Sequence, residues 1–122
     1  MLIVGERINT SRKAIEPAVR ARDVEFIQNE ARNQVASGAT YVDVNAGTLV
    51  SEEPEALAWL VQTVQAVVDV PLCIDSPNPI AIEAALKVHK GRAMVNSITA
   101  ERERYSAIVP LVKEYGCKIV AL

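Results

Sequence analysis

The chain has 122 residues, of which 50% are hydrophobic, and its formal net charge is −2 with a pI near 5.4. This length fits one ordinary domain. The slightly acidic balance argues against nucleic acid as a partner, because no basic surplus is present to replace phosphate counterions. No apolar run approaches the roughly 20 residues of a membrane helix, and the N-terminus is typical of a strand rather than a signal peptide. We therefore expect a cytoplasmic protein that binds neither nucleic acid nor membrane.

The first part of the chain predicts one strand and two helices. The strand covers residues 2–8, and Pro17 interrupts the short basic helix expected at 12–20, because proline removes a helical hydrogen bond. Asp23 is a good N-cap for the second helix, which residues 37–38 end with a glycine. The buried stripe expected on this helix consists of Phe26, Ile27, Ala31, Gln34 and Val35.

The middle of the chain predicts a strand, a helix and another strand. The first of these strands covers residues 40–45, and the helix signature begins at Ser51. Its first turn is acidic, which the helix dipole favours, and Pro54 is tolerated there. The apolar stripe of this helix consists of Leu57, Leu60, Val61, Val64, Val67 and Val68. The third strand follows at residues 71–75.

The last part of the chain repeats this alternation. A helix is expected over residues 78–89, followed by a fourth strand at 92–97. The next helix is capped by Thr99, interrupted by Pro110 and ended by a glycine. A fifth strand is expected at residues 118–122.

Near-continuous apolar strands that alternate with helices indicate a parallel α/β sheet covered on both faces. A TIM barrel and a doubly wound sheet both fit this pattern. The absence of a GxGxxG run after the first strand weakens a dinucleotide-binding interpretation. A closed (β/α)8 barrel needs eight strands, so five predicted strands indicate either a small open protein or the N-terminal part of a longer chain. We favour the second interpretation.

The predicted strands end in polar residues, and this is the clearest functional signal in the chain. Parallel strands bring their carboxyl ends to one edge of the sheet, so we expect these side chains to form one polar pocket. Carboxylates accept hydrogen bonds, and carboxamides both donate and accept. That combination suits a flat heterocycle with an amino group, ring N–H groups and a carbonyl. The strand-end residues are Glu6, Asn9, Asp43, Asn45, Asp75 and Asn96.

Two other interpretations of these residues remain open. Asp and Asn at strand ends often only cap helices or make turns. Asp43, Asp75 and Asn96 could instead hold Mg²⁺ together with water. The chain has neither a paired DxD motif nor a phosphate-binding loop, so we expect no metal site.

Other chemically reactive residues predict structure rather than catalysis. Cys73 and Cys117 are isolated, which favours reduced structural thiols. His89 is expected to be a solvated surface histidine, and Trp59 is expected to pack. A single histidine gives no Ser-His-Asp arrangement.

The strand-end motifs resemble those of the pterin-binding TIM barrels. They are most similar to the methyltetrahydrofolate:corrinoid/iron–sulfur protein methyltransferases, and the folate domain of cobalamin-dependent methionine synthase shares the pattern. The resemblance covers essentially the whole chain, residues 1–122, as a pterin-binding domain that is the first half of a barrel. The motifs that carry it are Gly5-Glu6-Arg7-Ile8-Asn9, Asp43-Val44-Asn45-Ala46-Gly47, Cys73-Ile74-Asp75-Ser76 and Met94-Val95-Asn96-Ser97.

This resemblance implies a role for each strand-end residue. The residues matching Asp75 and Asn96 hydrogen-bond the pterin ring in that family. Asp43 and Asn45 match a motif close to the pterin pocket. Glu6 and Asn9 match the first-strand motif near its mouth. The catalytic residues of the family lie in later strands, so we expect them beyond residue 122.

The resemblance also implies a reaction and partners. The family moves the N5-methyl group of 5-methyltetrahydrofolate to Co(I) of a cobalamin-type corrinoid. A partner corrinoid protein carries this corrinoid. N5 must gain a proton as its bond to the methyl group breaks. Family members form homodimers, so we expect one here. Alternatives are a non-catalytic pterin-binding fragment and a dihydropteroate synthase-like enzyme. The loop at residues 46–50 argues against the synthase, because it lacks the Ser-Thr-Arg-Pro run of that family.

Overall fold

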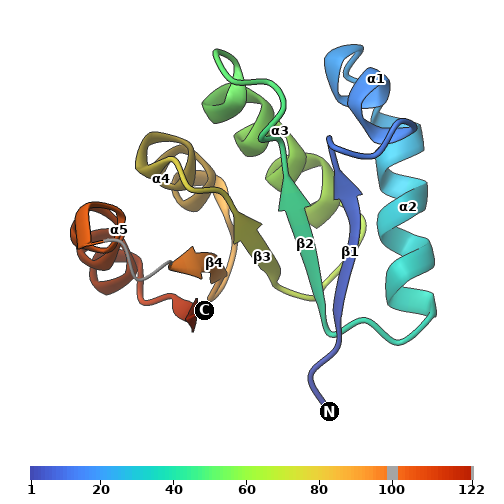
Figure 1. Cartoon of the computed structure of the whole chain (residues 1–122). Coiled ribbons are helices and arrows are strands. Elements are labelled where there is room, and N and C mark those ends of the chain that lie inside the picture. Colours follow the sequence, from blue (N-terminus) through green and yellow to red (C-terminus); the bar gives the residue numbers. More distant parts are fainter. Residues whose placement is uncertain (99–101, 122) are drawn as a thin grey trace.

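The computed structural model describes residues 1–98 and 102–121, which form one parallel five-stranded sheet in the order β1-β2-β3-β4-β5 (Figure 1). The strands are β1 (Val4–Asn9), β2 (Tyr41–Asn45), β3 (Leu72–Asp75), β4 (Met94–Ile98) and β5 (Lys118–Ala121). The helices are α1 (Ile15–Arg20), α2 (Val24–Ala36), α3 (Glu53–Gln65), α4 (Pro79–Val88) and α5 (Arg102–Tyr115).

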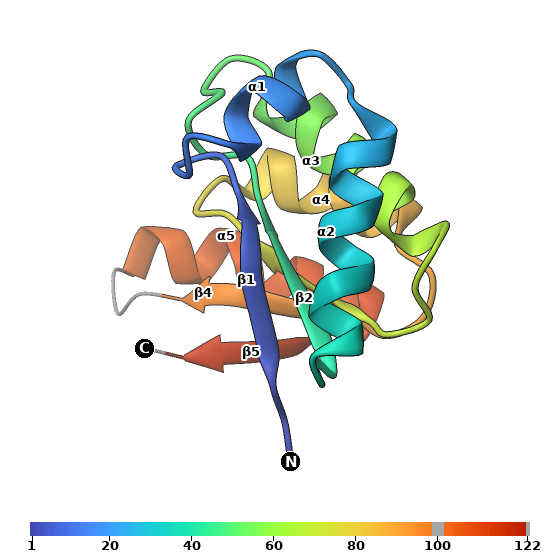
Figure 2. The ribbon, with the colours of Figure 1, turned by 90° about the vertical axis from the view of Figure 1, so that its right-hand side faces the viewer.

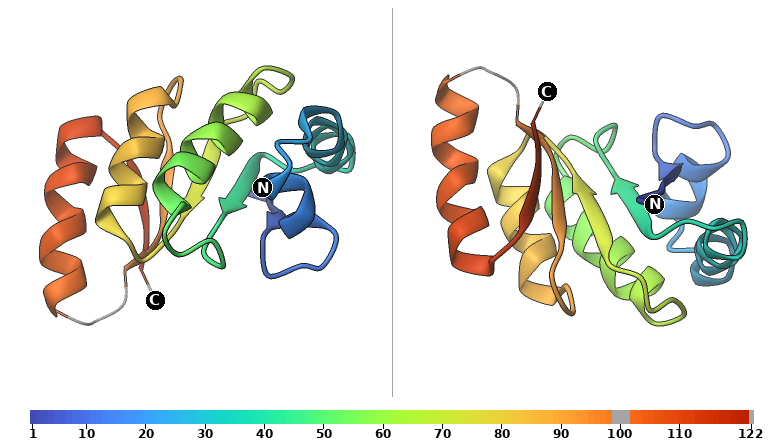
Figure 3. Two further views of the ribbon diagram at one scale, coloured as in Figure 1. Left: turned by 90° about the horizontal axis from the view of Figure 1, so that it is seen from above. Right: turned by 90° about the horizontal axis from the view of Figure 1, so that it is seen from below.

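All the helices lie along one side of the curved sheet, as the views from above and below show (Figure 3). The strands rotate progressively from β1 to β5 (Figure 2), as expected of a sheet that curls toward a barrel. Within the described residues the sheet does not close, and β1 and β5 are its two edges. The fold is therefore the predicted part of a (β/α)8 barrel. None of the helices that the structure describes is both long and apolar enough to span a bilayer.

The predicted helix signals are largely confirmed. Asp23 accepts a hydrogen bond of 3.1 Å from the N–H of Phe26, and Asn78 accepts one of 3.0 Å from the N–H of Ile80. After α2, Gly38 has a φ of +104°, a conformation that glycine adopts without strain. The two side-chain contacts satisfy N–H groups that a helix start leaves unpaired.

Four helix predictions need correction or lie outside the described residues. The first helix begins at Ile15 rather than at residue 12, and Pro17 lies in its first turn, where the missing N–H has no partner to lose. The helix expected from Ser51 begins at Glu53. Pro110 does not interrupt α5, which continues through it. The predicted cap, Thr99, lies outside the described residues.

The buried stripe predicted for α2 is correct except at one position. Ile27, Ala31 and Gln34 are buried against the sheet, and Val35 packs partly against the same core. Phe26 is instead 39% exposed. Consecutive residues of a helix point about 100° apart. When Ile27 faces the sheet, the side chain of Phe26 therefore points away from the buried stripe.

The face of the sheet away from the helices changes character along the strands. At the starts of the strands it carries a small apolar cluster of Tyr41, Cys73 and Met94, against which Val4 packs. The ammonium group of Lys118 lies 5.9 Å from the centre of the Tyr41 ring. Toward the strand ends the same face becomes polar. Side chains alternate between the two faces, so the apolar start and the polar end belong to one continuous surface.

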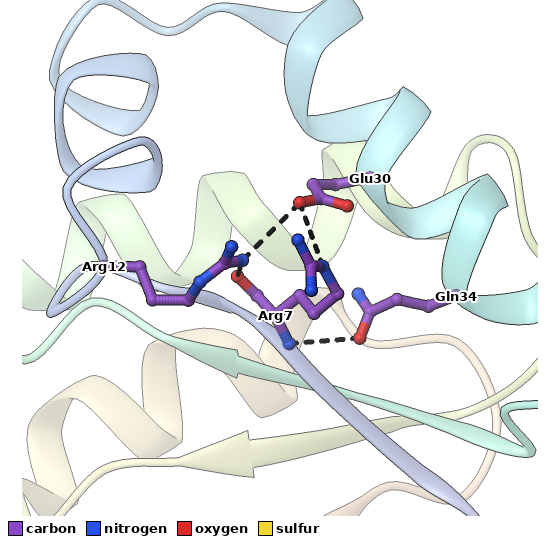
Figure 4. A network of polar contacts seen from close by, with 4 residues as sticks. All are labelled: Arg7, Arg12, Glu30 and Gln34. Atoms are coloured by element: carbon purple, nitrogen blue, oxygen red, sulfur yellow. Dashed lines mark hydrogen bonds and ion pairs between the residues drawn. The ribbon is translucent and has the colours of Figure 1, made fainter.

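The outer edge of β1 is held by polar contacts with α2 (Figure 4). The N–H of Arg7 donates to Oε1 of Gln34 at 3.1 Å, and Glu30 forms ion pairs with Arg7 at 3.3 Å and Arg12 at 3.5 Å. The register of β1 with β2 shifts between Gly5 and Ile8, around the residue that Gln34 binds. A cavity of about 440 Å³ lies along this edge, away from most of the strand ends.

Candidate functional site

Three of the six predicted site residues, Asn9, Asn45 and Asp75, are the last residues of β1, β2 and β3. The others lie inside strands, Glu6 in β1, Asp43 in β2 and Asn96 in β4, and Glu6 also lines the cavity between β1 and α2. The strand register pairs Asn9 with Asn45 and Asp75 with Asn96. It pairs Asp43 with Cys73, so Asp43 and Asp75 share a face on neighbouring strands. The register therefore brings these neighbouring residues together in pairs, and their convergence on one ligand pocket stays a prediction.

The carboxyl group of Asp43 is buried among acidic neighbours. Asp43 is 1% exposed, and neither of its oxygens has a donor of regular hydrogen-bond geometry in the described part of the chain. Burial, then the charge and hydrogen bond of Asp75 and the charge of Glu6, raises the pKa of Asp43 to about 8, while the thiol of Cys73 partly offsets the rise. Burial and the acidic neighbours of Asp43 thus favour its neutral form over its charged form.

Both cysteines are free and buried, as the sequence predicts. Burial, followed by the negative charges of Asp43 and Asp75, raises the pKa of the Cys73 thiol far above its usual range. Burial also raises the pKa of Cys117. A raised thiol pKa lowers the thiolate fraction, which makes both cysteines poorer nucleophiles.

Asp75 and Asn96 are the site residues most available to a ligand. Both are half-buried, and they lie side by side, Asp75 as the last residue of β3 and Asn96 in the middle of β4. Apart from the contact of Asp75 with Asp43, no described residue forms a hydrogen bond with either side chain. One carboxylate and one carboxamide thus stand together with their hydrogen-bonding capacity largely unused.

Asn9 and Asn45 have a local structural role. The Oδ1 atom of Asn9 accepts from the N–H of Ser11 at 2.9 Å, and that of Asn45 accepts from the N–H of Gly47 at 2.8 Å. Asp and Asn at strand ends often make such turns, which was one of the alternative interpretations of these residues. The NH₂ group of each carboxamide makes no hydrogen bond to a described residue and remains able to donate to a ligand.

A buried contact supports the loop directly after Asp75, and our sequence analysis missed it. The hydroxyl of Ser76 donates to Oε2 of Glu53 at 2.8 Å and accepts from the N–H of Asn78 at 3.0 Å. Glu53 is only 5% exposed. A signal was present, because Glu53 lies four residues before Leu57 and continues the buried stripe of α3.

The prediction that His89 is a solvated surface residue is wrong. Its Nε2 atom accepts from the N–H of Leu72 at 3.1 Å and lies 3.2 Å from Nε2 of Gln65. Its Nδ1 atom lies 3.2 Å from the carbonyl oxygen of Gly91, so Nδ1 carries the proton. Burial lowers the pKa of His89. The residue therefore connects the loop after α4 to the start of β3.

The remaining predictions concern packing and metal. Trp59 packs partly against the core, as predicted, and the guanidinium of Arg22 lies 5.3 Å from the centre of its ring. Within residues 1–98 and 102–121, no three His, Cys, Asp or Glu side chains are arranged to hold a metal ion.

Comparisons with known proteins identify relatives of this chain. The model of the pterin binding enzyme family matches residues 5–122. The chain is 39% identical over 111 residues to the methylcorrinoid:tetrahydrofolate methyltransferase of Eubacterium limosum, covering 91% of this chain and 41% of that protein. It is 26% identical over 128 residues to the methionine synthase of Mycobacterium tuberculosis, covering 100% of this chain and 11% of that protein. The chain thus spans less than half the length of either relative.

Proposed function

This chain belongs to the pterin binding enzyme family, and from that premise we propose that its protein transfers a methyl group between N5 of tetrahydrofolate and a corrinoid carried by a partner protein. The observation that carries the proposal is the adjacent pair of Asp75 and Asn96, half-buried and nearly free of protein partners. The folate-methyl role is supported by the name of the relative from Eubacterium limosum, which pairs a methylcorrinoid with tetrahydrofolate.

The pterin ring fits the donors and acceptors at the strand ends. The Asp75 carboxylate would accept from the amino group and a ring N–H, and the Asn96 carboxamide would donate to a ring acceptor and accept from a ring N–H. An apolar ligand would leave each of these groups unsatisfied, at about 1–3 kcal/mol apiece. We assign Glu6, Asn9 and Asn45 to the rim of the pocket.

The chemistry defines what the binding residues must do. A methyl amine is a poor electrophile, so N5 needs a proton or a hydrogen bond while its bond to the methyl carbon breaks. The corrinoid supplies the metal centre that exchanges the methyl group. The residues of this chain hold the pterin in one orientation and keep N5 accessible, which is the positioning part of catalysis.

The direction of transfer is part of the proposal. We expect the methyl group to move from 5-methyltetrahydrofolate to the corrinoid, whereas the name of the relative puts a methylcorrinoid first and tetrahydrofolate second. One pterin site serves both directions, because forward and reverse reactions pass through the same transition state. The partner corrinoid protein and the expected homodimer are part of the proposal.

Spectroscopy of free cobalamin tests the proposal. The protein in its full encoded length is mixed with 5-methyltetrahydrofolate and reduced cobalamin, or with tetrahydrofolate and methylcobalamin, and the visible spectrum is followed. We expect transfer in at least one direction, slowed by Asp75→Asn. Saturable folate binding without transfer in either direction would instead favour a non-catalytic pterin-binding protein.

A further inference from the structure

Two carboxyl groups of unequal burial, those of Asp43 and Asp75, interact at the candidate site. Asp43 on β2 is buried, whereas Asp75 on β3 is half-buried at the open polar face. The register pairs Asp43 with Cys73, which places Asp75 two residues further along the same face of the neighbouring strand. As a carboxylate, Asp43 would have two buried oxygens without a regular donor among the described residues.

The titratable groups that face Asp43 from the neighbouring strands are all acids. They are Glu6 on β1 together with Cys73 and Asp75 on β3. Two carboxylates in contact repel each other, and burial penalises the charge of the less solvated one more strongly. The proton that the pair retains therefore belongs on Asp43, and the charge belongs on Asp75.

We propose that Asp43 is a positioning residue that keeps its proton and donates it in a hydrogen bond to the ionised Asp75. This contact fixes the orientation of the Asp75 carboxylate and occupies one of its acceptor positions. The remaining acceptor positions point to the ligand. Where the proposed function holds, Asp43 acts on the pterin only through Asp75, and the ligand must present N–H donors.

The upward shift of the pKa of Asp43 to about 8 agrees with this arrangement. Because the two carboxyl groups interact, the higher of their two apparent pKa values is a property of both groups together. Asp43 is the group that is deprotonated at that higher pH. Above that pH the donor disappears and two adjacent negative charges remain. Affinity for a ligand that donates to Asp75 then depends on pH in a way that a purely structural Asp43 would not produce.

Carboxyl titration by ¹³C NMR tests the proposal without any ligand. Aspartate is labelled at its side-chain carboxyl in the protein of full encoded length, and signals are assigned with Asp43→Asn and Asp75→Asn. We expect one signal to titrate near pH 8, to vanish in Asp43→Asn, and to move to lower pH in Asp75→Asn. The exposed Asp69→Asn is the matched control and should leave that signal in place. A wild-type Asp43 that titrates below about pH 5 would overturn the proposal.

Folate binding gives a second readout that rests on the proposed function. We expect the affinity of the wild-type protein for 5-methyltetrahydrofolate to fall about tenfold per pH unit above pH 8, because one proton is lost. Asp43→Asn, which keeps an N–H donor for Asp75, should bind more tightly than Asp43→Val and lose this pH dependence. A wild-type protein that binds no folate would overturn the proposed function, and the NMR titration would still decide on Asp43. Tight folate binding by a wild-type protein in which Asp43 titrates below about pH 5 would overturn the inference about Asp43 and leave the proposed function in place.

Discussion

The main-chain N–H of Leu72 donates a hydrogen bond to Nε2 of His89 at 3.1 Å, which fixes the first residue of β3 to the loop that follows α4. The Nε2 atom can accept only while it carries no proton. The proton on Nδ1, directed at the carbonyl oxygen of Gly91, keeps the ring in this tautomer. The contact therefore depends on a neutral histidine.

We predict that the contribution of His89 to stability is lost in acid. Burial lowers the pKa of His89 in the folded state from the ordinary 6.5, so the unfolded state binds the proton more readily. The stabilisation is present above about pH 6.5 and falls as the pH decreases below it. His89→Gln removes this titration. We compare the free energies of unfolding of the wild-type protein and the variant, measured in urea. The wild-type value minus the variant value should be smaller at pH 5 than at pH 7.5. A difference that stays constant would contradict the prediction.

Asp43 should give a pH dependence of the opposite sign. Its folded-state pKa, about 8, lies above its ordinary value of 3.8, so its stabilising contribution is complete below about pH 4 and is lost as the pH rises to 8. The slope is at most about 1.4 kcal/mol per pH unit. In urea unfolding, Asp43→Asn should become more stable relative to the wild-type protein between pH 4 and pH 8. The prediction fails if Asp43→Asn and Asp69→Asn show the same trend.

The contact between Ser76 and Glu53 should support both stability and the site. Ser76→Ala leaves the buried Glu53 carboxylate without its donor, which costs about 1–3 kcal/mol of unfolding free energy. Because Ser76 follows Asp75 directly, the same change should also weaken folate binding. Ser51→Ala, at an exposed position before α3, is the matched control. Equal unfolding midpoints for the two variants would show that the contact contributes nothing.

A side chain at Gly5 should destabilise the edge of β1. A Cβ atom there would collide with Oε1 of Gln34, the atom that accepts from the N–H of Arg7. We expect Gly5→Ala to lower the free energy of unfolding by about 1–3 kcal/mol, because the partly buried hydrogen bond between Gln34 and Arg7 is broken. In a Gln34→Ala background the same substitution should cost much less. Additive costs in this double-mutant cycle would exclude Gln34 as the cause.

Periodicity predicts the backbone of this protein well because strand alternation and helix caps are local signals. The polar face was predictable for the same reason: Asp43, Asp75 and Asn96 each end a short apolar run. The chemical state of these residues was not predictable, because the pKa of Asp43 depends on burial and on groups from other strands. The contact of His89 with Leu72 joins residues 17 positions apart, and no local pattern encodes it.

Calorimetric titration of 5-methyltetrahydrofolate into the protein of full encoded length tests the central claim most directly. The claim predicts saturable binding by the wild-type protein and by Asp69→Asn. Asp75→Asn should bind at least about tenfold more weakly, because a charged acceptor is replaced by a neutral group. A well-folded protein that binds no folate, or an Asp75→Asn variant that binds as tightly as the wild type, would contradict the claim that Asp75 holds a pterin.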